Sequence, residues 1–177
     1  MESKRLRFRK YTLKDQDWLY KILSDPVTMA HYPKPYDEKG TLRWINWNLD
    51  NYEKYGFGLW ALELKENGEM IGDCGISMQK IDGRIMPEIG YHIDRRYWRM
   101  GLGKEAAKAV KDWGFRNTAF DALYSYMPAA NIASWSTAAS NGMKRIGEYD
   151  DPDGIRHYIY RITREEWQNG EADSRKK

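Results

Sequence analysis

The stretch RRYWRMGLGKEAAKAVKDWGF, residues 95–115, decides the fold, and it begins with a basic and aromatic run. Gly101 and Gly103 follow this run and stand directly before a helical pattern. Glycine has no Cβ, so an anion can approach the backbone closely at these positions. The first N–H groups of a helix have no partner within the helix and lie at the positive end of its dipole. The pattern therefore predicts a phosphate-binding loop flanked by Arg99 and Lys104.

The composition is typical of a globular chain without covalent cross-links. Its 177 residues are enough for one domain with its own hydrophobic core. The net charge of +3 is too small to indicate nucleic-acid binding without a local basic patch. Cys74 is the only cysteine, which excludes a disulfide within the chain. Since the sequence has no apolar run of membrane-spanning length and no signal-peptide core, we expect a cytoplasmic protein.

The first third of the chain predicts one strand and two helices. Residues 5–12 alternate between apolar and polar side chains, as a strand does. Thr12 and Asp15 resemble a capping box that begins a helix, and Pro26 ends that helix. Asp37 is expected to cap a second helix, in which apolar residues recur at helical spacing.

The middle of the chain predicts an antiparallel meander of three strands. The strands are expected at residues 56–65, 69–81 and 84–93. The first two are separated by Asn-Gly and the last two by Asp-Gly, which are strong signals for a tight hairpin.

The remainder predicts two helices and three strands. In the helix that follows the two glycines, from about residue 103 to 115, Lys104, Lys108 and Lys111 are expected to face solvent. A strand is expected at 122–128, a helix at 131–141, and a hairpin formed by 144–149 and 155–162. The order β-α-α-β-β-β-α-β-α-β-β predicts a single α+β domain over residues 1–168, and we expect 169–177 to be a disordered tail.

A dinucleotide-binding motif is the nearest alternative explanation of the glycines. The letters GLGKEA match G-x-G-x-x-A, and Asp121 follows at roughly the spacing of that motif's acidic residue. In that motif, however, the glycines follow a strand of a parallel sheet at once. Here residues 94–100 intervene, the preceding strands are joined by hairpins, and Asp121 comes before its strand. The context therefore argues against a dinucleotide site.

The sequence resembles the GNAT superfamily of N-acetyltransferases, and within it the ribosomal-protein N-terminal acetyltransferases of RimJ and RimL type. The resemblance is carried by PEIGYHIDRRYWRMGLGKEA at residues 87–106 and by NIAS at 131–134, and the element order agrees over about residues 4–168. The usual loop of the family is Q/R-x-x-G-x-G/A; here Trp98 stands at its first position and both glycines match. The resemblance implies a GNAT fold, with a mostly antiparallel sheet that splays between strands 4 and 5 and is flanked by about four helices.

The resemblance also implies an acyltransferase that uses acetyl-CoA as co-substrate and needs no metal. The acceptor would be a primary amine, on a small molecule or a protein N-terminus, which attacks directly in a ternary complex. A non-catalytic CoA-binding or nucleic-acid-associated module on the same fold is the alternative, and we expect a monomer or a homodimer. The implied cofactor-binding residues are the strand backbone of Tyr91, His92 and Ile93, the N–H groups of Arg99, Met100, Gly101, Leu102, Gly103 and Lys104, and Asn131 at the pantetheine end.

Glu88 is the expected general base. Glu88, Gly90 and His92 share one face of their strand, because side chains alternate. In the superfamily, a glutamate near this position often acts as base, and a partly buried glutamate with a raised pKa can do so near neutral pH. Two alternatives stay open: Glu88 pairs with a nearby lysine or arginine, or His92 is the base.

The general acid is less well marked. Many relatives place a tyrosine seven residues after the asparagine, where this chain has Ala138. Ser134 is the remaining candidate, although a hydroxyl near a helix start more often caps the backbone. Among aromatic residues, Trp44 and Trp47 are expected to form the core and flank of the second helix, and the resemblance places this helix beside the acceptor. The three histidines do not stand at metal-ligand spacings with each other or with Cys74.

Overall fold

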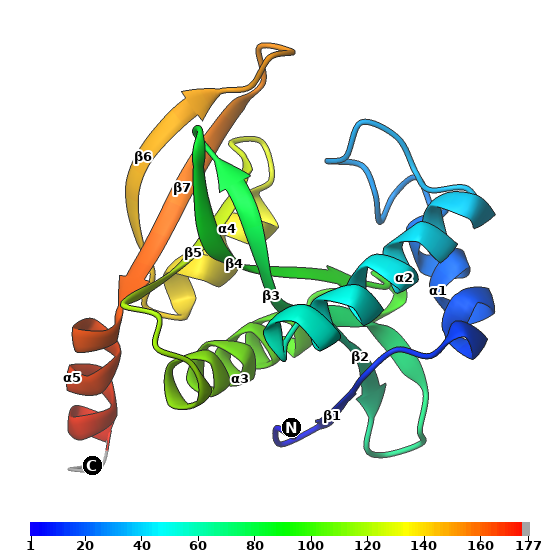
Figure 1. The fold of residues 1–177 in the computed structure, drawn as a ribbon, viewed down its shortest axis with the longest axis horizontal. Helices are drawn as coiled ribbons and strands as arrows, with labels where there is room; N and C mark the ends of the chain where they lie inside the picture. The colour runs from blue at the N-terminus through cyan, green and yellow to red at the C-terminus, as the bar shows by residue number, and fades with distance from the viewer. Residues whose placement is uncertain (175–177) are drawn as a thin grey trace.

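The computed structural model, which describes residues 1–174, is built on a seven-stranded sheet (Figure 1). The strands are β1 (Leu6–Arg9), β2 (Leu59–Leu64), β3 (Met70–Ile81), β4 (Arg84–Ile93), β5 (Ala122–Pro128), β6 (Lys144–Asp150) and β7 (Arg156–Thr163). Their order across the sheet is β1-β2-β3-β4-β5-β7-β6. Every neighbouring pair is antiparallel except β4 and β5, which are parallel. The predicted α+β fold with a mostly antiparallel sheet is confirmed.

Helices cover both faces of this sheet. Those described are α1 (Gln16–Leu23), α2 (Glu38–Tyr55), α3 (Leu102–Asn117), α4 (Ile132–Ser140) and α5 (Arg164–Ser174), with short 3-10 turns at Leu13–Asp15 and Arg95–Tyr97. His92 of β4 contacts Trp44 of α2, whereas Tyr91 and Ile93 lie against Gly103 of α3. Since side chains alternate along a strand, α2 and α3 lie on opposite faces of β4.

The predicted local signals have the expected partners. The Thr12 N–H donates to Oδ2 of Asp15 over 2.6 Å at the start of the first helical turn. The Gly40 N–H donates to Oδ1 of Asp37 over 2.6 Å, which caps α2. The predicted meander is also confirmed, because β3 and β4 pair in register from Gly72 and Ile93 down to their tight turn.

Lys111 corrects one prediction for α3. The sequence places it on the solvent face, but the side chain is buried and Nζ donates to the carbonyl of Asn141 over 2.8 Å. Burial lowers the pKa of this amine. The helical pattern correctly places Lys111 on the face of α3 opposite the apolar stripe. It does not show that α4 and the turn after it cover that face.

The C-terminal helix α5 corrects the prediction of a disordered tail. The sequence predicts disorder from residue 169, but the chain stays helical through Ser174; residues 175–177 lie outside the described part. Trp167 stacks on Phe115 with ring centroids 5.3 Å apart, and its indole N–H donates to Oδ1 of Asp112 over 2.9 Å. These contacts fix the first part of α5 on α3, and Glu171, within the predicted tail, forms an ion pair with Arg116 of α3 at 2.9 Å.

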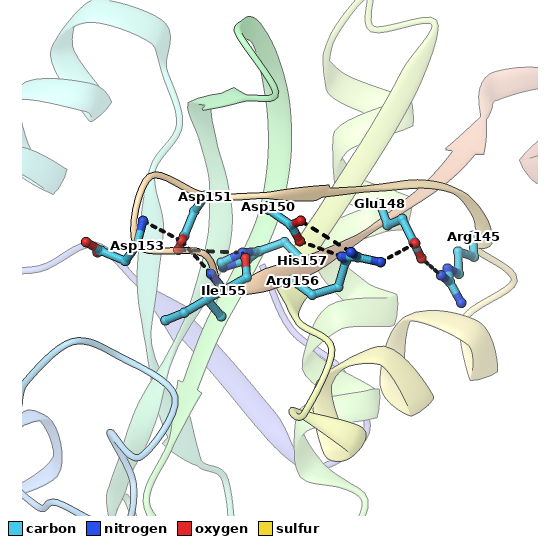
Figure 2. A network of polar contacts seen from close by, with 8 residues as sticks. All are labelled: Arg145, Glu148, Asp150, Asp151, Asp153, Ile155, Arg156 and His157. Atoms are coloured by element: carbon cyan, nitrogen blue, oxygen red, sulfur yellow. Dashed lines mark hydrogen bonds and ion pairs between the residues drawn. The ribbon is translucent and has the colours of Figure 1, made fainter.

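The β6–β7 hairpin is tied together at its end by polar contacts (Figure 2). The carboxylate of Asp151 accepts the N–H groups of Asp153 and Ile155 and fixes the turn. Arg156 bridges Glu148 and Asp150 on the neighbouring strand. Figure 1 shows the tips of this hairpin and of the β3–β4 hairpin on the same side of the molecule.

Candidate active site

The parallel pair β4 and β5 is joined over a very short distance. Their register contains one residue pair, Glu88 with Tyr124, and next to it Oγ of Ser125 donates to the carbonyl of Ile89 over 2.8 Å. Beyond this point β5 continues its pairing with β7 only. The sheet therefore splays between its fourth and fifth strands, as the sequence resemblance implies.

The splay leaves part of the β4 edge open. The His92 N–H points toward β3, where it donates to Oδ1 of Asp73 over 3.0 Å. Backbone groups alternate along a strand, so those of Tyr91 and Ile93 point toward the splay. The Ile93 carbonyl is used by the Trp98 indole N–H, at 2.7 Å. In the described residues, no β5 residue pairs with Tyr91, which leaves its N–H and C=O to an extended ligand.

The glycine loop follows the turn at residues 94–100 and lies beside this edge, with Gly103 next to Ile93 and Tyr91. Gly101 is the N-cap of α3 with φ of 74°, and Arg99 also has a left-handed backbone, with φ of 63°. Arg99, Met100 and Lys104 are exposed. Alternation of left-handed and ordinary residues turns successive N–H groups to one side, which forms an anion-binding concavity at the helix start.

Gly103 tests whether the loop has room for a ligand. A Cβ built there would lie 3.6 Å from Cγ1 of Ile93 and 4.0 Å from Cε2 of Tyr91, which are ordinary contacts. Its φ is not in the left-handed region. Neither packing nor backbone geometry therefore requires glycine at this position. A glycine would be required if a phosphate approached the backbone closely, because a Cβ would block that approach. The residues of the loop therefore fit a phosphate-bearing ligand.

Arg5 supports the loop from a distant part of the chain. Its Nη1 donates to the carbonyl of Met100 over 2.9 Å, and its Nε donates to Glu105 in the first turn of α3 over 2.7 Å. Oγ of Ser3 donates to the same carboxylate over 2.7 Å. Sequence reasoning missed this contact, because no local pattern links the residues before β1 to a loop 95 residues later.

Glu88 lies where the two strands separate. The side chain is half-buried, and burial raises its pKa to about 8. Two hydrogen bonds oppose this shift, from Oγ of Ser77 at 3.5 Å and from the Tyr126 N–H. No lysine or arginine within residues 1–174 forms an ion pair with Glu88, so the expected alternative of a structural ion pair is not observed. A carboxyl that titrates near neutral pH can accept or donate a proton.

His92 lies on the same face as Glu88 and is buried, with 6% of its surface exposed. Its Nδ1 is 2.8 Å from Oδ1 of Asp73. The Asp73 carboxylate also accepts the hydroxyl of Tyr11 and the indole N–H of Trp44, each at 2.8 Å. Burial alone raises the pKa of Asp73, but the adjacent imidazole and these donors outweigh it, so the pKa is lowered. The ionised carboxylate of Asp73 therefore holds the His92 ring in place, a role that the sequence did not indicate.

The residues at the start of α4 are occupied by local contacts. Oδ1 of Asn131 accepts the Ser134 N–H over 3.1 Å and so caps the helix. Oγ of Ser134 lies 3.2 Å from the Tyr91 hydroxyl, which joins α4 to β4. Ala138, in place of the usual tyrosine, is buried. The structure thus brings Ser134 to the phenol of Tyr91, an additional hydroxyl, whereas the described contacts of the Asn131 side chain lie within α4.

The described residues contain no group of three or more histidine, cysteine, aspartate or glutamate side chains arranged to hold a metal ion. Over the same part of the chain, no helix has the length and apolar character needed to cross a membrane.

Comparison with known proteins extends these observations. Residues 5–144 match the family described as acetyltransferase (GNAT) domain. The uncharacterized protein YkkB of Bacillus subtilis is 38% identical over 152 residues, which cover 84% of this chain and 88% of that protein. A GNAT-family acetyltransferase from Bacillus anthracis superposes with a TM-score of 0.80 at 24% identity, over 93% of this chain and 98% of the other.

A second solved structure is the ribosomal L7/L12 alpha-N-protein acetyltransferase RimL in complex with coenzyme A. Its TM-score is 0.76 at 16% identity, over 91% of this chain and 95% of that chain. At such identities, the two structural likenesses show the fold alone.

Proposed function

The chain belongs to the GNAT acetyltransferase family, and on this basis we propose that it transfers an acetyl group from acetyl-CoA to a primary amine. The observation that carries the proposal is the open edge of β4 at Tyr91, beside which the Gly101–Gly103 loop lies after the turn formed by residues 94–100. An extended amide-bearing arm suits a strand edge, and a pyrophosphate suits a helix start. Coenzyme A presents both groups in one molecule.

The proposed binding residues divide into three groups. The backbone of Tyr91, with its neighbours His92 and Ile93, holds the pantetheine arm like an added strand. The N–H groups of residues 99–104 hold the pyrophosphate, and the Asn131 amide group, whose oxygen caps α4, contacts the arm through its nitrogen. Acetyl-CoA supplies the activated acyl group.

Glu88 is the proposed base, because its raised pKa and its lack of a cationic partner suit proton transfer near neutral pH. The neutral amine attacks the thioester carbonyl; a C–N bond forms and the C–S bond breaks. Glu88 accepts the proton that leaves the nitrogen, and the departing thiolate takes a proton from Ser134 or from water. Ser134 is the candidate acid since its hydroxyl lies beside the open strand edge.

Two classes of acceptor amine are candidates. The resemblance to the RimJ and RimL branch favours a protein N-terminus, and a small-molecule amine is the other. A non-catalytic CoA-binding or nucleic-acid-associated module is the second candidate function, favoured by Ala138 in place of the usual tyrosine. A cytoplasmic location and a monomeric or homodimeric state stay predictions from the sequence.

Two measurements test the proposal. CoA and acetyl-CoA should raise the melting temperature, whereas NAD should not, because a ligand bound only by the native state stabilises it. A mass-spectrometric screen with acetyl-CoA and a panel of amines should then find an acetylated product. Stabilisation by NAD but not by CoA would show that the loop is a dinucleotide-binding site. Stabilisation by CoA without any acetylated product would favour the non-catalytic module.

A further inference from the structure

His92 carries a buried polar atom that the proposed chemistry does not use. Its Nε2 is buried and has no hydrogen-bond partner in the described part of the chain. An unpaired buried polar group costs stability, so it is rare unless it has a role. Its neighbours on this side are rings: Trp44, with centroids 5.4 Å apart, and Tyr32, with centroids 5.1 Å apart. Neither interaction satisfies a ring nitrogen.

The hydrogen bond to Asp73 determines what Nε2 can do. An ionised carboxylate only accepts, so Nδ1 of His92 carries the proton and donates it over 2.8 Å. In the neutral imidazole, Nε2 then presents a lone pair. Nε2 is therefore the ring nitrogen of His92 that a ligand can meet, since Nδ1 is already used by Asp73.

The position of His92 relative to Glu88 indicates what it accepts from. Both residues are on one face of β4, with Gly90 between them, so no intervening side chain separates them. The Glu88 carboxylate leans over Gly90, with Oε2 3.5 Å from the place that a Cβ would take there, and it does not bond the Nε2 of His92 in the described residues. An acceptor whose reactive amine lies at Glu88 can therefore reach Nε2 with a second, neighbouring polar group.

Tyr32 lies over this surface from the segment between α1 and α2. Its ring lies against the His92 ring, with centroids 5.1 Å apart. It is also 41% exposed and belongs to no helix or strand, so it can move aside without disturbing the sheet.

We propose that His92 is a specificity-determining residue, whose Nε2 accepts a hydrogen bond from a second N–H or O–H group of the acceptor. This inference rests on the proposed function. The reactive amine lies at Glu88, and the second donor lies at His92 beneath Tyr32. The acceptors that fit are diamines and amino alcohols; simple alkylamines leave Nε2 unpaired.

A matched substrate series tests this with the wild-type protein alone. The acceptors are α,ω-diamines, amino alcohols and n-alkylamines with two to five carbons, each assayed with acetyl-CoA. The best bifunctional acceptor should exceed the alkylamine of equal length in kcat/KM by roughly 10- to 100-fold, the usual effect of leaving a buried polar group unpaired. Equal values throughout the series would overturn the inference while leaving the acetyltransferase assignment intact. If the protein binds acetyl-CoA but acetylates no amine, both this inference and the proposed acetyltransferase function are wrong.

Two variants assign the preference to Nε2. His92→Asn keeps an amide N–H near the position of Nδ1, so Asp73 retains a donor, but nothing replaces Nε2. His92→Gln extends the amide to the position of Nε2. The ratio of kcat/KM between bifunctional and simple amines should fall toward one in His92→Asn and be partly restored in His92→Gln. This ratio does not change with the folded fraction, since both substrates report on the same active molecules.

Two other results would contradict the proposal. If His92→Asn keeps the wild-type ratio, Nε2 does not contact the acceptor. If ω-amino acids outperform diamines and lose that advantage in His92→Asn, Nε2 is a protonated donor that binds a carboxylate, and the assigned substrate class is wrong.

Discussion

Replacement of Glu88 by glutamine tests the proposed base by two independent measurements. Glutamine keeps the size of the side chain but cannot accept the amine proton. At a pH where Glu88 is ionised, turnover should fall by roughly two to four orders of magnitude, the usual contribution of a general base. Acetyl-CoA affinity should change little, because the proposed binding groups are the backbone at Tyr91 and the loop after it.

The pH dependence of the wild type gives the magnitude. A carboxyl with a pKa of about 8 is roughly one-tenth ionised at pH 7 and nine-tenths ionised at pH 9. With an acceptor amine that is already neutral at pH 6, kcat/KM should therefore rise roughly tenfold between pH 7 and 9. Glu88→Gln should not show this rise. Initial rates are measured by chromatographic quantification of CoA from pH 6 to 9.5.

Stability provides the second measurement. The native pKa of Glu88 is raised above its unfolded value, so the unfolded state loses this proton first as pH rises. This residue's contribution is fully present below about pH 4.5 and is lost as pH approaches 8, by about 1.4 kcal/mol per pH unit. Between pH 5 and 7 the loss is at most about 3 kcal/mol, less where solvent reaches the half-buried carboxyl. Glu88→Gln should lack this loss.

Urea unfolding at both pH values measures the effect, and Glu66→Gln is the matched control. Glu66 is exposed in the turn between β2 and β3, so its variant should follow the wild type in stability and in turnover. Glu88→Gln with wild-type turnover from pH 6 to 9 would show that another group removes the proton. If the variant is inactive and also less stable at pH 7, Glu88 has a structural role, and the assignment is wrong.

Two further variants test the loop. Gly103→Ala should weaken CoA binding by calorimetry with a nearly unchanged melting temperature, because a Cβ makes only ordinary contacts there but covers the phosphate surface. Gly147→Ala, in open space on β6, should bind CoA as the wild type does. Arg5→Ala should weaken CoA binding several-fold, since the carbonyl of Met100 loses its support, and change unfolding free energy by no more than about 1 kcal/mol. Arg7→Ala, two residues later in β1, is its control, and equal affinities in the two arginine variants would show that the contact of Arg5 with Met100 is unimportant.

The sequence by itself determined the order of elements and the position of the loop. The caps at Asp15 and Asp37 and the tight hairpin turns depend on residues within a few positions of each other. The phosphate loop is a local pattern of the same kind, and strand alternation alone places Glu88 and His92 on one face. Such features need no knowledge of the rest of the molecule, so they could be read correctly.

Only the tertiary structure decided which groups meet from distant parts of the chain. Asp73 reaches His92 across the β3–β4 register, and the Arg5 side chain reaches the loop from a position 95 residues earlier in the chain. Lys111 is buried because α4 and its following turn cover it, and Trp167 anchors α5 by stacking on α3. In each case burial and hydrogen bonding depend on how faces pack together. A local pattern gives the periodicity of a face but not the identity of the surface that covers it.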